Sequence, residues 1–179
     1  FCISSRSAGR FSIQAFDLSP DGRQLCVGCG RPKGQVLIWD LEQDDEMRSL
    51  YPGTVDSYVG NVHWHPRQPW LATSHRDGKV RVWDVASGEL RWEREACQIA
   101  CFCARWSPDG EHLIAGGDLP DYGLSIWDRD GEFLRRLPPH GATIQAACWS
   151  PDGKQIATGG REQEIRLFSV DSGELLQTV

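Results

Sequence analysis

The sequence repeats itself four times, with 42 to 46 residues between equivalent positions. Each repeat contains a proline-centred turn, and an aromatic residue follows that proline after 17 or 19 residues. Two markers that recur in phase restrict the chain to repeat architectures, in which each unit buries its apolar face against the next unit. The turn prolines are Pro20, Pro66, Pro108 and Pro151, and the aromatic residues are Trp39, Trp83, Trp127 and Phe168.

Within one repeat, the residue pattern predicts four short β-strands. Residues 79–84 alternate polar and apolar side chains, as expected for a strand with one more buried face. Three of the four turns read Ser-Pro-Asp-Gly, in which Pro fixes φ at the first corner and Gly accepts a positive φ at the last. An apolar run follows each turn, and a short segment such as residues 90–93 closes the unit. Four strands in a unit of this length predict a β-propeller blade.

Three Trp-Asp dipeptides recur in phase with these turns. Through them the sequence resembles the WD-repeat β-propellers, over residues 10–179. The resemblance implies an all-β fold, in which residues 1–179 form a single propeller segment of four four-stranded antiparallel blades. The blades are expected at about residues 8–51, 52–95, 96–138 and 139–179. The residues that the resemblance marks as structural are Trp39, Asp40, Asp77, Trp83, Asp84, Asp121, Trp127, Asp128, His140 and Phe168.

In strong WD repeats, a His before the first strand, a Ser or Thr, a turn Asp and the Trp form a hydrogen-bonded network. The resemblance places His140 in register in the fourth blade, where Phe168 replaces the Trp and Glu162 replaces the Asp. No blade carries the complete set, so we expect the blades to depend on packing more than on this network. The second and third blades have Asp77 with Trp83 and Asp121 with Trp127, and their His positions hold Val55 and Cys97.

The number of repeats predicts an incomplete ring. WD-repeat propellers usually close with seven or eight blades, and this chain supplies four. An open arc leaves one apolar sheet face uncovered on each end blade, and such faces recruit another chain. We therefore expect further blades of a longer parent chain, or a second copy, to complete the ring. The start at Phe1, without an initiator Met, fits a piece of a longer chain.

The charge balance argues against general binding to nucleic acid or to anionic membranes. The chain has 19 Lys and Arg against 25 Asp and Glu, which gives a formal net charge of −6. Nucleic acids and anionic membranes are bound through a basic field. No apolar run approaches the ~20 residues that span a bilayer. We therefore expect protein or peptide partners, and neither nucleic acid nor a membrane.

The seven cysteines favour free, packed thiols. An odd count leaves at least one thiol unpaired, and unpaired thiols indicate a reducing compartment, most simply the cytoplasm. The close pairs Cys26 with Cys29 and Cys101 with Cys103 leave a zinc interpretation open. Residues three apart on a strand point to opposite faces, however, which disfavours Cys26 with Cys29. We expect no metal and no cofactor.

No catalytic constellation is evident in the sequence. There is no Gly-x-Ser-x-Gly segment, and His63 and His65 offer a metal two ligands without an evident third. We therefore expect a non-catalytic protein-interaction scaffold rather than an enzyme. The alternatives are an accessory or regulatory propeller of a larger signalling enzyme (kinase, protease or NTPase), and a hydrolase-type propeller with a metal in its central channel.

The resemblance also implies where partners would dock. On WD-repeat propellers this is commonly the face formed by the loops between blades and between the second and third strands, around the central channel. Tyr and Arg are favoured there because they combine contact area with directed polar contacts. The inner-strand positions are Ser12, Gln14, Tyr58, Gly60, Ala100, Phe102, Thr143 and Gln145, and the loops add Arg31, Lys33, His75, Arg76, Tyr122 and Arg161. The partner-binding candidates are Tyr58, His75, Arg76, Phe102, Tyr122, Gln145 and Arg161, with Arg76 and Tyr122 first.

Overall fold

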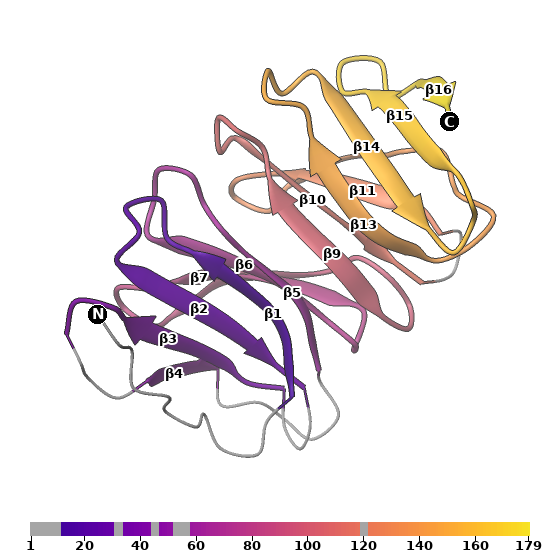
Figure 1. The fold of residues 1–179 in the computed structure, drawn as a ribbon. Coiled ribbons are helices and arrows are strands. Elements are labelled where there is room, and N and C mark those ends of the chain that lie inside the picture. Colours follow the sequence, from indigo (N-terminus) through magenta and orange to yellow (C-terminus); the bar gives the residue numbers. More distant parts are fainter. Residues whose placement is uncertain (1–11, 31–33, 44–46, 52–57, 119–121) are drawn as a thin grey trace.

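The computed structural model describes residues 12–30, 34–43, 47–51, 58–118 and 122–179. In these ranges every regular element is a β-strand, and the sixteen strands form four sheets of four (Figure 1). Each sheet is antiparallel, with its strands in sequence order. The predicted all-β fold of four four-stranded antiparallel blades is confirmed.

Each blade begins with its inner strand and ends with its outermost strand. The first blade contains β1 (Ile13–Leu18), β2 (Gln24–Cys29), β3 (Val36–Asp40) and β4 (Arg48–Tyr51). The second contains β5 (Val59–Trp64), β6 (Trp70–His75), β7 (Lys79–Asp84) and β8 (Leu90–Glu95). The third contains β9 (Cys101–Trp106), β10 (His112–Gly117), β11 (Leu124–Asp128) and β12 (Phe133–Arg136). The fourth contains β13 (Ile144–Trp149), β14 (Gln155–Gly160), β15 (Ile165–Ser169) and β16 (Leu175–Thr178).

The Ser-Pro-Asp-Gly turns fold as their residues predict. In the third blade, Ser107 donates its hydroxyl proton to Asp109 Oδ1 over 2.5 Å and accepts the N–H of His112 over 2.9 Å. Gly110 takes a φ of 79°, which only glycine adopts without strain. The same hydroxyl–carboxylate bond joins Ser19 to Asp21 and Ser150 to Asp152.

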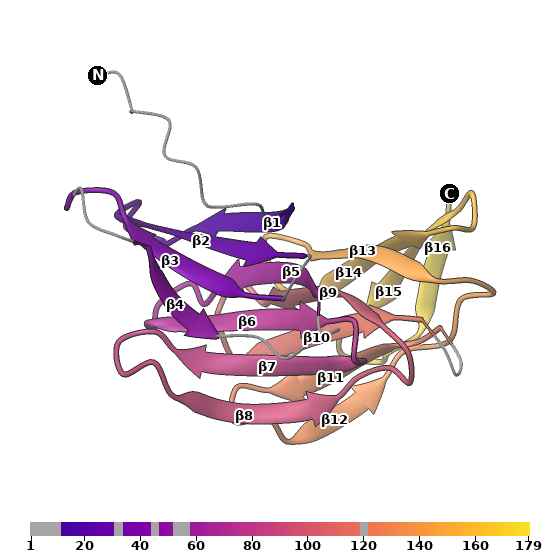
Figure 2. The same ribbon diagram turned by 90° about the horizontal axis from the view of Figure 1, so that it is seen from below.

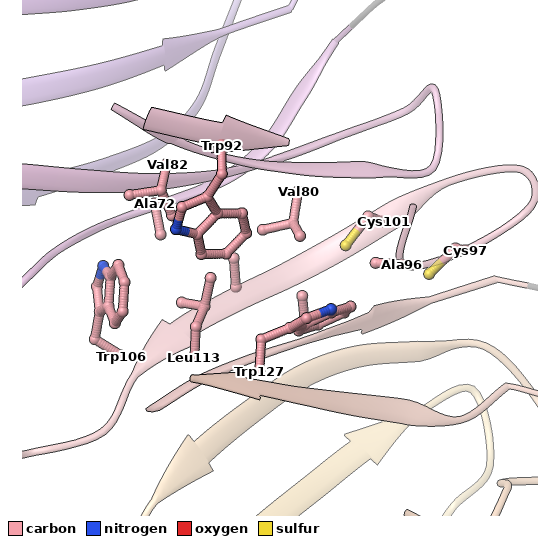
Figure 3. Close-up of a cluster of buried hydrophobic side chains, with 12 residues drawn as sticks. Ala72, Val80, Val82, Trp92, Ala96, Cys97, Cys101, Trp106, Leu113 and Trp127 are labelled. Carbon is pink, nitrogen blue, oxygen red and sulfur yellow. The ribbon is translucent and has the colours of Figure 1, made fainter. Parts of the chain in front are cut away.

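The buried core is divided among the interfaces between neighbouring blades. Trp92, Trp106 and Trp127 lie between the second and third blades, around Leu113 and Val80 (Figure 3). Trp83 belongs to the cluster between the first and second blades, and Phe168 to the cluster between the third and fourth. Apolar area removed from water stabilises the fold by roughly 25 cal/mol per Å². Most of the described core therefore holds blades to one another.

The four blades form an arc rather than a closed ring (Figures 1 and 2). The inner strands pack in sequence, β1 on β5, β5 on β9 and β9 on β13, and blades 1 and 4 lie at the two ends. Large apolar side chains stay open to solvent on these end blades. Phe16 is 71% and Leu18 51% exposed on β1, and Ile165 is 52% exposed on β15. The expected incomplete ring is observed.

Across the described ranges, no helix is long and apolar enough to cross a membrane.

Candidate functional site

The inner strands of the first three blades converge on a cavity of about 360 Å³, here called the channel pocket. Its lining comes from the ends of β1, β2, β5 and β9 and from the residue that follows β6. Five of the eight lining residues are inner-strand positions that the sequence predicts to face the channel. The lining residues are Ser12, Gln14, Gly30, Tyr58, Val59, Gly60, Arg76 and Phe102.

Two glycines allow the strands to approach closely at this pocket. A Cβ on Gly60 would lie 2.7 Å from the carbonyl oxygen of Cys101, on the neighbouring inner strand. A Cβ on Gly30 would lie 2.5 Å from Ser12 Oγ. Real Cβ atoms do not approach other atoms so closely, because overlap at this range is strongly repulsive. At Gly60 the obstacle is backbone, so the shape of the channel pocket depends on glycine there; at Gly30 a Cβ would displace the Ser12 side chain.

Arg76 and Tyr58 form a pair at the pocket wall. The backbone N–H of Arg76 donates to the carbonyl oxygen of Tyr58 over 2.8 Å. The Arg76 guanidinium carbon lies 5.5 Å from the centre of the Tyr58 ring, within cation–π range. Arg76 remains exposed, and Phe102 is half-buried on β9. The structure thus brings together three of the predicted partner-binding residues.

His75 is not on a loop, as we expected, but at the end of β6. It pairs with Val59 across the sheet and is fully buried. Its Nε2 shares a hydrogen bond of 2.8 Å with Thr73 Oγ1, which also accepts the Trp83 indole N–H over 2.9 Å. Burial lowers the pKa of His75 to about 3, with a smaller contribution from Arg81. Its assignment as a partner-binding residue is wrong, because no part of its side chain reaches the surface.

The second blade therefore contains a histidine network after all. Its His comes from its own second strand rather than from the segment before the inner strand. Asp77, two residues further on, accepts the Lys79 N–H over 3.1 Å and pairs with Arg81 over 2.7 Å. The expectation that the blades depend on packing more than on such a network did not foresee these hydrogen bonds.

The fourth blade uses His140, as the resemblance implies. His140 Nε2 lies 2.6 Å from Thr158 Oγ1, and its Nδ1 lies 3.4 Å from Glu162 Oε2. The Phe168 ring packs 6.2 Å from the His140 ring, where a Trp would otherwise close the network. Burial also lowers the pKa of His140, which favours the neutral imidazole. These residues hold the blade together and leave no free imidazole edge for chemistry.

The aspartates of the Trp-Asp dipeptides terminate their strands. Asp84 Oδ1 accepts the N–H of Ser87, and Asp128 Oδ1 accepts the N–H groups of Asp130 and Glu132. Asp40 Oδ1 does the same for Glu42 and Gln43. The Trp rings beside Asp84 and Asp128, Trp83 and Trp127, are buried, whereas Trp39 is half-buried.

The other partner-binding candidates lie outside the channel pocket. Gln145 on β13 and Arg161 after β14 are exposed, and neither lines that pocket. Tyr122 is half-buried with a φ of 51°, a left-handed conformation that is uncommon outside glycine. Arg31, Lys33 and Asp121 lie outside the described residues.

A larger hollow, of about 690 Å³, runs along the uncovered face of the fourth blade. Apolar side chains and backbone line most of it, with His63 and Arg105 at its edge. Burial lowers the pKa of His63 to about 3, and His63 Nδ1 accepts the Trp106 N–H over 3.1 Å. The sequence did not predict this hollow, because its lining residues come from three different blades and are far apart in the chain. Its other lining residues include Ala146, Cys148, Ala157, Gly159 and Ile165.

Metal binding has little basis in the described part of the chain. No group of three or more His, Cys, Asp or Glu residues there could hold a metal ion. Cys26 and Cys29 are separate buried thiols, with Cys26 donating to the Asp17 carbonyl oxygen over 3.3 Å. Cys101 and Cys103 likewise contact backbone carbonyls.

Comparison with known protein sequences identifies a family. The family model described as "WD domain, G-beta repeat" matches residues 46–84, 94–128 and 131–169. The small ribosomal subunit protein RACK1y of Oryza sativa subsp. japonica is 29% identical over 126 residues, which cover 66% of this chain and 35% of that protein. The GATOR2 complex protein WDR24 of Homo sapiens is 30% identical over 53% of this chain and 12% of its own length.

A solved structure shows the same arrangement of blades. A chain in the crystal structure of the mitotic checkpoint complex superposes with a TM-score of 0.84 at 24% identity. The match covers 98% of this chain and 53% of that one, so the four blades correspond to about half of the solved chain. The chain likewise spans about a third or less of the curated relatives just named. With matched segments over more than half of its residues, the chain belongs to the WD-repeat family.

Proposed function

We propose that the protein is a non-catalytic interaction scaffold that binds a protein or peptide at the channel pocket. The observation that carries this proposal is the convergence of Tyr58, Arg76 and Phe102 around one cavity. These residues lie on, or directly beside, strands of well-packed sheets. Because those strands are already ordered, little backbone conformational entropy is lost when a partner binds. Aromatic and arginine side chains in a pocket are the residues that dominate protein interfaces.

The lining also predicts the chemistry of the ligand. The Arg76 guanidinium lies over the Tyr58 ring at the pocket wall, where its N–H groups can bind a carboxylate. Phe102 and Val59 provide apolar surface, and Ser12 and Gln14 add neutral hydrogen-bonding groups. We therefore expect a peptide segment with an acidic side chain next to an apolar one.

A non-catalytic role is supported by the positions of the imidazoles. His63, His65, His75 and His140 each hydrogen-bond to a backbone or hydroxyl group of the blades. Burial lowers the pKa of each, so that the neutral form persists at neutral pH. Their bonding accounts for them as structural residues.

The relatives support protein partners in general terms. The names of RACK1y and WDR24 place those proteins in a ribosomal subunit and in the GATOR2 complex. We propose further that additional blades, or a second copy, cover the exposed faces of the first and fourth blades. The six cysteines in the described ranges are free thiols, which supports a cytoplasmic location.

Selection from a random peptide library against the full chain tests the channel pocket. The selected peptides are measured by fluorescence polarisation against the parent chain and against Arg76→Ala, Phe102→Ala and Arg161→Ala. We expect about tenfold or weaker binding for the first two variants, which corresponds to about 1.4 kcal/mol or more. Arg161→Ala, an exposed arginine outside the pocket, is the matched control. Equal binding by all variants, or a library that yields no peptide, would contradict the proposal.

A further inference from the structure

Three cysteines gather where the second blade passes into the third. Cys97 lies in the segment between β8 and β9, Cys101 begins β9, and Cys103 is two residues further along. All three side chains are buried, Cys97 at 8% exposure and the others at 3% or less. Figure 3 shows the sulfur atoms of Cys97 and Cys101 at the same end of the hydrophobic cluster. Neither thiol takes part in the channel pocket.

Cys97 borders a cavity that opens to solvent, and Cys101 and Cys103 are not among the residues that line it. This cavity, of about 320 Å³, is lined by Cys97 together with Asp77, Glu95, Ala96, Gln98 and Arg136. The backbone N–H of Cys97 donates to the Gly78 carbonyl oxygen over 2.9 Å, which fixes the residue at the cavity wall. This places Cys97, although it is largely buried, beside a cavity that a small reagent can enter.

A half-buried arginine provides positive charge near this thiol. Arg136 Nη1 donates to Ser125 Oγ over 3.0 Å and lies 3.5 Å from the Ala96 carbonyl oxygen, one residue before Cys97. Gly123 leaves room for the side chain, since a Cβ there would lie 2.6 Å from Arg136 Nε. The guanidinium is thus held in place rather than free to turn into solvent.

The neighbouring thiol favours the same ionised form. The pKa of Cys97 lies below that of an ordinary thiol, because Cys101 hydrogen-bonds to it and Arg136 adds a favourable charge; these effects outweigh its burial and the opposing carboxylate of Asp118. Burial raises the pKa of Cys101 well above its usual range, and its bond to Cys97 raises it further. Of the two neighbouring thiols, Cys97 is therefore the more readily ionised.

We propose that Cys97 is a peroxide-reactive thiol and that Cys101 is its resolving partner. The Cys97 thiolate attacks a peroxide oxygen, the O–O bond breaks, and hydroxide leaves, so that Cys97 becomes a sulfenic acid. Cys101 sulfur then attacks the Cys97 sulfur, its proton leaves with the hydroxyl as water, and a disulfide forms. One hydrogen peroxide is reduced to two waters while two thiols are oxidised to one disulfide.

The surrounding thiols provide internal comparisons. Burial raises the pKa of Cys26 and of Cys103 to about 12, so both remain protonated and unreactive. Cys148 is exposed but has no second cysteine beside it among the described residues. Exposure alone would make Cys148 the first thiol to react, whereas the proposed microenvironment favours Cys97.

Peptide mapping separates these thiols, because trypsin releases residues 95–105 as one peptide that contains Cys97, Cys101 and Cys103. After treatment of the full chain with hydrogen peroxide, we expect this peptide to lose about 2 Da, the mass of two hydrogens. In Cys101→Ser, we expect a gain of about 16 Da, the sulfenic acid, in place of that loss. Cys103→Ser is the matched control and should retain the loss of 2 Da.

A kinetic measurement on the unmutated chain keeps the test valid if a cysteine variant fails to fold. The rate at which methyl methanethiosulfonate modifies residues 95–105 should titrate below the usual thiol pKa of about 8.5. Arg136→Gln should raise that titration midpoint, whereas Arg135→Gln, at the neighbouring arginine that donates to the Asp171 carbonyl oxygen, should leave it unchanged. Oxidation confined to the Cys148 peptide, or a midpoint at or above the usual value, would overturn the proposal.

Discussion

Trp83 and His75 are joined through one hydroxyl group, that of Thr73, which lies 2.9 Å from the indole nitrogen and 2.8 Å from the imidazole nitrogen. All three side chains are buried, so the two hydrogen bonds form away from competing water. They tie the third strand of the second blade to the end of its second strand. This connection ties the second and third strands of the second blade together within its core.

Replacement of Trp83 by Ala should therefore unfold the chain or lower its thermal midpoint sharply. The substitution removes a large side chain between two blades and leaves Thr73 without its indole donor, at a cost of about 3–5 kcal/mol. Trp127→Ala, between the second and third blades, should have an effect of the same size. Differential scanning calorimetry measures both. Arg76→Ala is the control, expected to shift the midpoint by no more than about 2 °C. Unchanged midpoints in the Trp variants would contradict this packing.

Acid should destabilise the protein well above the range in which carboxylates titrate. Folding lowers the pKa of His63 and His75 to about 3, in each case mainly through burial. An unfolded His titrates near 6.5. Between about 6.5 and 3 the unfolded chain therefore binds protons that the folded chain does not, and the free energy of unfolding falls as pH falls.

The measurement for this effect is urea denaturation at pH 8, 7, 6 and 5. Each neutral buried His should contribute a loss approaching about 1.4 kcal/mol per pH unit below 6. His75→Gln should be less stable at pH 8 but should show a smaller loss between pH 7 and 5. A free energy of unfolding that stays constant down to pH 5 would show that these imidazoles are not buried in the neutral form.

Alanine substitutions at Gly78 and Gly88 distinguish destabilisation by steric overlap from destabilisation by backbone strain. Gly78 has a φ of 80°, and a Cβ there would lie 2.0 Å from the Cys97 carbonyl oxygen. Gly88 has nearly the same φ, 78°, with no atom within 4 Å of such a Cβ. Gly88→Ala should therefore cost about 1–2 kcal/mol from backbone strain alone. Gly78→Ala should cost considerably more, because the backbone of the next blade must move as well. Equal losses in chemical denaturation would show that the space around Gly78 is not filled.

The in-phase repeat predicted most of the fold, because the position of each strand follows from side-chain alternation and from turns that only certain residues adopt. The resemblance to WD-repeat propellers implied that Tyr58 and Phe102 lie at the channel, and both line the channel pocket. The sequence pattern could not predict that His75 is buried in a strand. A residue next to a turn can belong to the strand or to the loop, and only the pairing of His75 with Val59 decides between them. The approach of Arg76 to Tyr58 depends on how the ends of β5 and β6 meet, and the contact of Arg136 with the Cys97 segment depends on how the second and third blades join. Such contacts leave no periodic signal in a sequence.

The last prediction concerns the uncovered faces at the two ends of the arc. Phe16 and Leu18 are exposed on the first blade, and the hollow beside Ile165 presents apolar surface on the fourth. Apolar surface of this kind associates to escape water, and a twofold arrangement of two arcs would cover both faces at once. We therefore expect the chain to self-associate, with an average mass in sedimentation equilibrium that rises over a hundredfold range of concentration.

Ile165→Glu places a charge on one of these faces and should shift the midpoint of association at least tenfold toward higher concentration, because a buried unpaired carboxylate is costly. Gln145→Glu, an exposed change of the same charge outside the hollow, should leave the association unchanged. A chain that stays monomeric at every concentration, with a sharp thermal transition, would show that these faces are stable in water without a covering blade.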